Sequence, residues 1–193
     1  MTSSSSFAFR FTRLSVLMLA TLAHSLYAAR PSIGQKAPDF SLPSINGDPV
    51  RLSEQLSKGP VVLVVLRGYP GYQCPFCNRQ AQDFISNAND FAGLGVTVLL
   101  VYPGPEKDLT ARAKEFLEGK NLPAHFKLAL DPGYTFTNLY GLRWEAKNET
   151  AYLSTFLIDR EGKIFSVLIS TSHGGRAKAS EVLDQLKKRT AVK

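Results

Sequence analysis

The hydrophobic residues of the chain alternate between short unbroken runs and longer stretches with a helical period. Residues 61–66 and 96–102 hold no charged side chain, which is typical of strands that are covered on both faces. Residues 75–91 and 106–118 instead repeat apolar side chains at intervals of three and four, which predicts amphipathic helices. This alternation predicts an α/β fold, with a mixed, mostly parallel sheet between helices on both faces.

Shorter elements complete the predicted sheet. They are, in chain order, a strand at 126–130, a short helix at 133–140, two strands at 155–158 and 164–169, and a last helix at 176–189. A turn at 159–162 joins the two final strands, which are therefore expected to be antiparallel. Ahead of the sheet, Asn46-Gly47 separates two short apolar segments and predicts an N-terminal hairpin arm.

The first 28 residues have the order of a secretory signal peptide. Arg10 and Arg13 precede an apolar stretch at 14–26, Ala28 closes the segment, and no acidic residue occurs before Asp39. An uncleaved anchor is the alternative, although the stretch is shorter than the roughly 20 residues that span a membrane. We therefore expect an exported protein, periplasmic or secreted, with one domain at 31–190 and no membrane association after cleavage.

Charge argues against a nucleic-acid partner. The 193 residues carry a formal charge of +7, and removal of Arg10 and Arg13 leaves 21 basic against 16 acidic residues, or +5. The basic residues are scattered, apart from a cluster at 187–189 that ends the last predicted helix, where cations complement the helix dipole. We interpret the charge as favouring solubility and helix capping.

The only two cysteines, Cys74 and Cys77, stand three positions apart where the first buried strand gives way to a helix. Positions i and i+3 of a helix lie about 5 to 6 Å apart, which suits a disulfide. The free N–H groups and positive dipole of the helix N-terminus favour a thiolate on the first cysteine. A bridge over two residues removes little chain entropy, so the pair suits a redox switch better than a structural staple, which is the alternative.

Three further motifs, taken with this pair, resemble the thioredoxin-fold superfamily, and within it the peroxiredoxin-like redoxins (alkyl hydroperoxide reductase / thiol-specific antioxidant). They are the opening Ile-Gly-Gln-Lys-Ala-Pro-Asp-Phe-Ser-Leu at 33–42, Arg-Gly at 67–68 leading into Cys-Pro-Phe-Cys, and Ser-Thr-Phe-Leu-Ile-Asp at 154–159 followed by Gly-Lys-Ile at 162–164. The resemblance covers about residues 33–186 and implies a single three-layer thioredoxin-like domain.

The resemblance implies thiol chemistry with antioxidant activity and no cofactor. Cys74 is the expected nucleophile, Cys77 the resolving cysteine, and a separate thiol protein the reductant. A peroxide is the leading substrate. A protein disulfide, handled by thiol–disulfide exchange, is the alternative, and a non-enzymatic redox sensor with an exposed Cys74 is a second one.

Four positions bear on that choice. Arg67, at the end of the first buried strand, is expected to lower the Cys74 pKa and to orient a peroxide, unless it is a surface arginine paired elsewhere. Gly71 stands where peroxiredoxins carry Thr or Ser, and Leu153 where they carry Arg and thioredoxins carry a cis-proline. Arg143 substitutes for that arginine only if its loop folds over the site.

The remaining candidates have plainer interpretations. Arg79 is expected on a solvated helix face. Aromatic residues at positions 69, 72 and 76 suit either an apolar rim around the sulfurs or ordinary packing. His125 and His173 lack the spacing of a zinc finger, so we expect no metal site, and His173 is interpreted as a turn residue.

Overall fold

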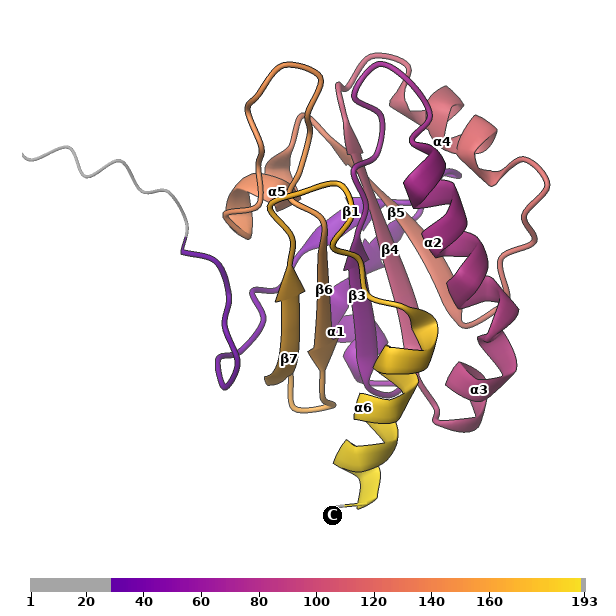
Figure 1. Cartoon of the computed structure of the whole chain (residues 1–193), viewed down its shortest axis with the longest axis vertical. Coiled ribbons are helices and arrows are strands. Elements are labelled where there is room, and N and C mark those ends of the chain that lie inside the picture. The colour runs from indigo at the N-terminus through magenta and orange to yellow at the C-terminus, as the bar shows by residue number, and fades with distance from the viewer. Residues whose placement is uncertain (1–28, 192–193) are drawn as a thin grey trace, which may run out of the picture.

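A five-stranded sheet with the order β5-β4-β3-β6-β7 runs through the centre of the protein (Figure 1). The computed structural model describes residues 29–191, so the predicted signal peptide lies outside the described residues. The strands are β3 (Val61–Val65), β4 (Thr97–Gly104), β5 (Phe126–Pro132), β6 (Ser154–Ile158) and β7 (Ile164–Ile169). β3, β4 and β5 are mutually parallel, whereas β6 is antiparallel to both β3 and β7. This arrangement confirms the predicted mixed, mostly parallel sheet.

Two layers cover the sheet. Helices α2 (Pro75–Ser86), α3 (Ala88–Gly93), α4 (Leu109–Leu117) and α6 (Ala179–Ala191) bury their apolar sides on one face. The hairpin of β1 (Ser41–Pro43) and β2 (Pro49–Arg51) covers the other face, together with the short helices α1 (Leu52–Leu56) and α5 (Thr135–Leu139). The three layers and the hairpin arm match the prediction, while α1 is an addition to it. Within residues 29–191, no helix is long and apolar enough to cross a membrane.

The side chains of β3 explain why its sequence is apolar throughout. Val62 and Val64 pack under the α2, α4 and α6 layer, whereas Val61, Leu63 and Val65 face the hairpin arm. Because successive side chains of a strand point to opposite faces, a strand with a layer on each side needs an apolar residue at every position.

The predicted helix at 75–91 is divided in two. Asn87 leaves the helical region (φ −103°, ψ 18°), and its side-chain amide donates to the carbonyl of Asp83 at 2.8 Å. An asparagine that bonds a backbone carbonyl in this way competes with the helical ladder. Phe84 and Phe91 nevertheless stack across the break, with ring centroids 5.5 Å apart, so both short helices cover the same core.

The last helix begins at Ala179 rather than at 176. The backbone N–H of Ala179 donates to the carboxylate of Asp83 in α2 at 2.8 Å, which ties the start of α6 to the helix that carries the cysteines. Residues 171–178 therefore form a loop at the sheet edge where α2 begins, and Arg176 belongs to that loop and not to the helix.

Gly68 allows the chain to turn from β3 toward the cysteines, and Gly68→Ala is expected to destabilise the fold. Its φ is +65°, and an added Cβ would lie 1.8 Å from the carbonyl oxygen of Pro103. The left-handed backbone and the clash together predict a loss of about 2 kcal/mol or more in the free energy of unfolding, measured by urea denaturation. The control is Gly93→Ala, where the added Cβ meets nothing within 4 Å. Equal denaturation midpoints for the two variants would contradict this account of Gly68.

Candidate functional site

Both cysteines lie at the N-terminus of α2. Cys74 is the N-cap residue with an extended backbone (φ −74°, ψ 114°), and Pro75 occupies the first turn, where a missing N–H costs nothing. Cys77 follows within the first turn and is fully buried, while Cys74 keeps only 1% of its surface exposed. Both are free thiols, so the described site is in its reduced form.

The two thiols have opposite acidities. A hydrogen bond from the Cys77 thiol, the backbone N–H groups of Cys77 and Phe76, and the charge of Arg176 together lower the pKa of Cys74 to about 5, against the opposing effect of burial. Burial and the hydrogen bond to Cys74 instead raise the pKa of Cys77 well above its usual value. At neutral pH the pair therefore holds one thiolate, on Cys74, and one thiol, on Cys77.

Arg176 is the cation that contacts both sulfurs. Its two terminal nitrogens lie 3.7 Å from the Cys74 Sγ and 3.6 Å from the Cys77 Sγ. The guanidinium also donates to the side-chain oxygen of Gln80 at 3.0 Å and to the carbonyl of His173 at 3.3 Å. A guanidinium held in this way stabilises negative charge on either sulfur and offers N–H donors beside the reacting atom.

Arg67 lies at the predicted edge of the sheet, but its guanidinium points elsewhere. It forms a two-pronged ion pair with Glu149, with both nitrogen–oxygen distances at 2.8 Å, and also donates to the hydroxyl of Tyr72 and the carbonyl of Asn148. The alternative of an arginine paired elsewhere therefore describes its side chain, although it is buried and not on the surface. Its contribution to the sulfurs comes through its backbone, which favours the thiolate of Cys77.

Arg143 and Leu153 supply no charge to the sulfurs. The Arg143 guanidinium donates to the carbonyls of Trp144, Glu149 and Thr150 and lies 3.9 Å from the centre of the Tyr134 ring, so it stabilises its own loop. Leu153 is buried as an apolar residue, and no cis peptide bond occurs within residues 29–191. The position where related folds carry an arginine or a cis-proline thus has neither here.

The topology places Arg176 beside the cysteines. β7 is antiparallel to β6, which is antiparallel to β3, so β3 and β7 run in the same direction. Their following segments, which carry Cys74 and Arg176, therefore leave the sheet at the same edge. Sequence reasoning missed Arg176 because the predicted last helix included it. The predicted antiparallel pairing of the two final strands could have indicated that the segment after the last strand lies at the same edge as the cysteines.

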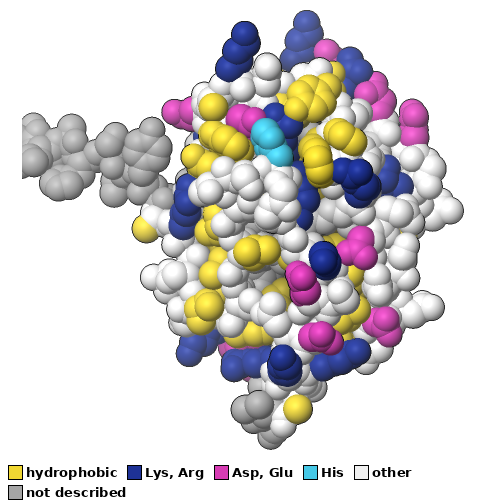
Figure 2. Space-filling model, in the orientation of Figure 1, with side chains coloured by type: hydrophobic (Ala, Val, Ile, Leu, Met, Phe, Trp, Pro, Cys, Tyr) yellow, Lys and Arg dark blue, Asp and Glu magenta, His cyan; other side chains and the backbone are white. Residues whose placement is uncertain are grey.

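Aromatic side chains surround this edge of the protein. Tyr72 and Phe76 are 45% and 44% exposed, and Arg79 covers the Phe76 ring at 4.6 Å. Tyr69 is partly buried against the core with Arg112 above its ring. Figure 2 shows hydrophobic side chains gathered toward the upper end of this face, where Figure 1 places the start of α2. Tyr72 and Phe76 therefore form an exposed rim, whereas Tyr69 takes part in ordinary packing against the core.

The two described histidines serve separate contacts. His125 donates to the carbonyl of Ala88 at 3.0 Å, and His173 lies 2.8 Å from a carboxylate oxygen of Glu149. Over the described part of the chain, no group of three or more His, Cys, Asp or Glu side chains is arranged to hold a metal ion. His173 therefore contacts a carboxylate, in addition to lying in the turn that its Ser-His-Gly-Gly context predicts.

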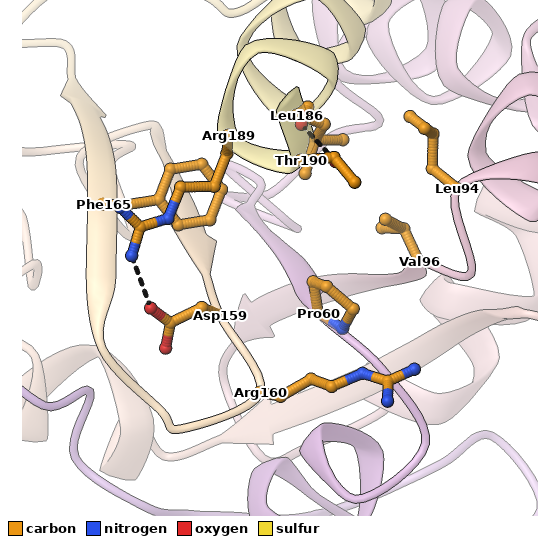
Figure 3. A pocket seen from close by; sticks show the side chains of 9 residues that line it. All are labelled: Pro60, Leu94, Val96, Asp159, Arg160, Phe165, Leu186, Arg189 and Thr190. Atoms are coloured by element: carbon orange, nitrogen blue, oxygen red, sulfur yellow. Dashed lines mark hydrogen bonds and ion pairs between the residues drawn. The ribbon is translucent and has the colours of Figure 1, made fainter. Parts of the chain in front are cut away.

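A cavity of about 300 Å³ lies at the opposite edge of the sheet, next to the beginnings of β3 and β4 (Figure 3). It is lined by Pro60, Leu94, Val96, Asp159, Arg160, Phe165, Leu186, Arg189 and Thr190. Arg189 is neutralised there by Asp159 at 3.0 Å and covers the Phe165 ring. No cysteine lines this cavity, so it is separate from the thiol site.

Known proteins resemble this chain over most of its length. The model of the AhpC/TSA family matches residues 33–167. Peroxiredoxin Bcp of Bacillus subtilis is 34% identical over 138 residues, which cover 68% of this chain and 81% of the relative. Thiol-disulfide oxidoreductase ResA of Geobacillus thermodenitrificans is 27% identical over 166 residues, covering 83% and 86%. The crystal structure of peroxidoxin BcpB from Mycobacterium tuberculosis matches with a TM-score of 0.66 at 26% identity, covering 83% of this chain and 97% of that one.

Proposed function

Since the chain belongs to the AhpC/TSA family, we propose that it is an exported thiol peroxidase in which Cys74 attacks a peroxide and Cys77 resolves the product. Its relatives are peroxiredoxins and thiol–disulfide oxidoreductases, so the chain is a thiol-dependent oxidoreductase of the peroxiredoxin type. The choice of a peroxide as substrate, the two cysteine roles and the export go beyond that family assignment.

The observation that carries the proposal is the environment of the Cys74 sulfur. The residue is 1% exposed, its pKa is lowered to about 5, and the Arg176 guanidinium lies 3.7 Å from its sulfur. A hydroperoxide is small enough to approach a nearly buried thiolate, whereas a disulfide in a folded protein needs a sulfur that projects from the surface. The sensor hypothesis required an exposed Cys74 with no cation nearby, which is the reverse of this geometry.

The proposed reaction has two steps on the protein. The Cys74 thiolate attacks the terminal peroxide oxygen, the O–O bond breaks, and the alkoxide or hydroxide that leaves takes a proton from water. The resulting sulfenic acid of Cys74 is attacked by the sulfur of Cys77, which forms the disulfide and releases the hydroxyl group, with the Cys77 proton, as water. A thiol reductant protein then supplies two electrons and two protons to restore the pair.

Arg176 has two tasks in this scheme. Its positive charge favours the Cys74 thiolate in the resting site, and its N–H groups can donate to the peroxide oxygens as negative charge moves onto the leaving one. The second contact, to Cys77, suits the next step, since Cys77 must lose its proton while it attacks. The high pKa that burial gives Cys77 keeps it protonated until then.

Thiol–disulfide exchange is the second candidate. The spacing of Cys74 and Cys77 supports it, as does the likeness to ResA, whose name gives it that activity. In that reaction the Cys74 thiolate would attack a substrate disulfide and Cys77 would resolve the mixed disulfide. The near-complete burial of Cys74 is the observation against it.

Stopped-flow oxidation of the reduced protein distinguishes the two candidates. Mixed with stoichiometric hydrogen peroxide at pH 7, the protein is expected to lose its thiols at least about 100-fold faster than free cysteine, because its thiolate is fully formed and paired with a cation. The parallel experiment uses a model protein disulfide. Peroxide oxidation at the rate of free cysteine, with fast disulfide exchange, would establish the second candidate instead.

Export is proposed from the signal-peptide pattern of residues 1–28. Cleavage after Ala28 would leave a mature chain that begins at Ala29, two residues before the predicted domain. N-terminal sequencing of the protein recovered from the producing cells tests this expectation. A protein that retains its first residues and stays with the membrane would support the anchor alternative.

A further inference from the structure

Glu149 is a buried carboxylate at the same edge of the sheet as the cysteines. Its side chain is 8% exposed, and its two oxygens accept from the Arg67 guanidinium, each at 2.8 Å. One of these oxygens also accepts from the Nε2 of His173 at 2.8 Å. The arginine neutralises the carboxylate, so Glu149 brings a fixed acceptor to the edge of the site without an uncompensated negative charge near the Cys74 thiolate.

These contacts join three segments that are far apart in the sequence. Arg67 lies two residues after β3, Glu149 lies in the loop before β6, and His173 lies in the loop between β7 and α6. The carbonyl of His173 accepts from the Nε of Arg176 at 3.3 Å. A continuous series of contacts thus runs from the ion pair of Arg67 with Glu149, through His173, to the guanidinium on the two sulfurs.

The loop that carries Arg176 has few other supports. All residues from 171 to 175 are exposed, and Ser172 bonds the hydroxyl of Ser170, whose own N–H donates to the carbonyl of Leu153. On the other side of Arg176, the carbonyl of Ala177 accepts from the Gln80 amide at 3.2 Å. The His173 ring is 45% exposed but packs beside the Trp144 ring, with centroids 5.6 Å apart. An arginine loses side-chain entropy when it is fixed, so the loop that carries Arg176 must itself be held for the guanidinium to stay in place.

We propose that His173, anchored on Glu149, is a positioning residue that holds the 171–176 loop and thereby keeps the Arg176 guanidinium on the sulfurs of Cys74 and Cys77. Arg67 acts one step further away, as the buried partner that fixes the Glu149 carboxylate. The inference rests on the proposed roles of Cys74 and Arg176. It gives a function to Arg67, Glu149 and His173, none of which contacts a sulfur through its side chain in the described site.

The test measures the Cys74 thiolate directly, by its absorbance near 240 nm as the pH is changed. His173→Ala is expected to raise the pKa of Cys74 by roughly 0.5 to 1 unit, because the guanidinium spends less time near the sulfur. His173→Gln retains an N–H donor for Glu149 and is expected to restore most of the shift. Thr171→Ala, an exposed change in the same loop, is the matched control and is expected to have no effect.

A double-mutant cycle separates positioning from a general loosening of the site. Once Arg176 is replaced by methionine, adding His173→Ala is expected to shift the Cys74 pKa no further, since His173 acts through the guanidinium. An undiminished second shift, an unchanged pKa in His173→Ala, or an equal shift in Thr171→Ala would each overturn the proposal. The readout does not depend on peroxide turnover, so slow peroxide reduction by the native protein would refute the proposed function and leave this test intact.

Discussion

Cys74→Ser is expected to abolish peroxide reduction, whereas Cys77→Ser is expected to leave one rapid oxidation per molecule. A serine hydroxyl is not ionised at neutral pH, so the first change should lower the rate constant for peroxide by more than about 1,000-fold. Cys77 carries the raised pKa and the fully buried sulfur, which suit it to the second step and not to the first. Without it, the sulfenic acid of Cys74 has no neighbouring thiol to condense with and should accumulate.

Rapid mixing with hydrogen peroxide, followed by trapping with a sulfenic-acid reagent and mass measurement, checks both outcomes. Native protein should end as an intramolecular disulfide, and Cys77→Ser should end with one molecule of the trapping reagent attached to the Cys74 sulfur. Cys77→Ala, unlike Cys77→Ser, also removes the hydrogen bond that contributes most to lowering the Cys74 pKa, so the first oxidation of the alanine variant should slow at acid pH more than at pH 8. If Cys77→Ser blocked the first oxidation at every pH, the two cysteine roles would have to be exchanged.

The fold was predictable because its signals are local. The apolar run of β3, the turn between β6 and β7, and the Asn46-Gly47 hairpin each specify one element within a few residues. The break at Asn87 was missed because the apolar pattern continues across it, and only the contact of the asparagine with the backbone ends α2. The late start of α6 depends on Asp83, about a hundred residues earlier, which no local pattern contains.

The sequence predicts where the backbone of the site lies, but not where its long side chains point. Cys74 and Cys77 are fixed by the strand and helix that flank them, and the end of β3 brings Arg67 to the expected edge. The direction of a long side chain is decided by partners from distant loops, and Glu149 competes successfully for the Arg67 guanidinium with an ion pair at 2.8 Å. Arg176 takes the place beside the sulfurs because β7 leaves the sheet at the same edge as β3. An arginine was expected near the thiolate, but the one that lies there is Arg176, from the C-terminal part of the chain, and not Arg67.

Arg176→Met is expected to raise the pKa of Cys74 and to slow peroxide reduction by roughly 10- to 100-fold at pH 7. The charge of Arg176 is one of several causes of the low pKa, behind the hydrogen bond from Cys77, so a rise of roughly one unit is expected. Starting from a pKa of about 5, such a rise still leaves most of Cys74 as thiolate at pH 7. The loss of rate at pH 7 therefore measures the donors that Arg176 supplies to the peroxide, and not the amount of thiolate.

The pH dependence separates these two contributions. Because the pKa of Cys74 is depressed, the thiolate is present above about pH 5 and is lost as the pH falls through that value. Arg176→Met should therefore lose more rate at pH 5 than at pH 8, and Arg176→Lys, which keeps the charge but not the two-pronged donor, should lose rate about equally at both. Arg79→Met is the control, since that guanidinium covers the Phe76 ring one turn into the same helix. A variant of Arg176 that matched the Arg79 control at both pH values would show that the cation beside the sulfurs has no part in the reaction.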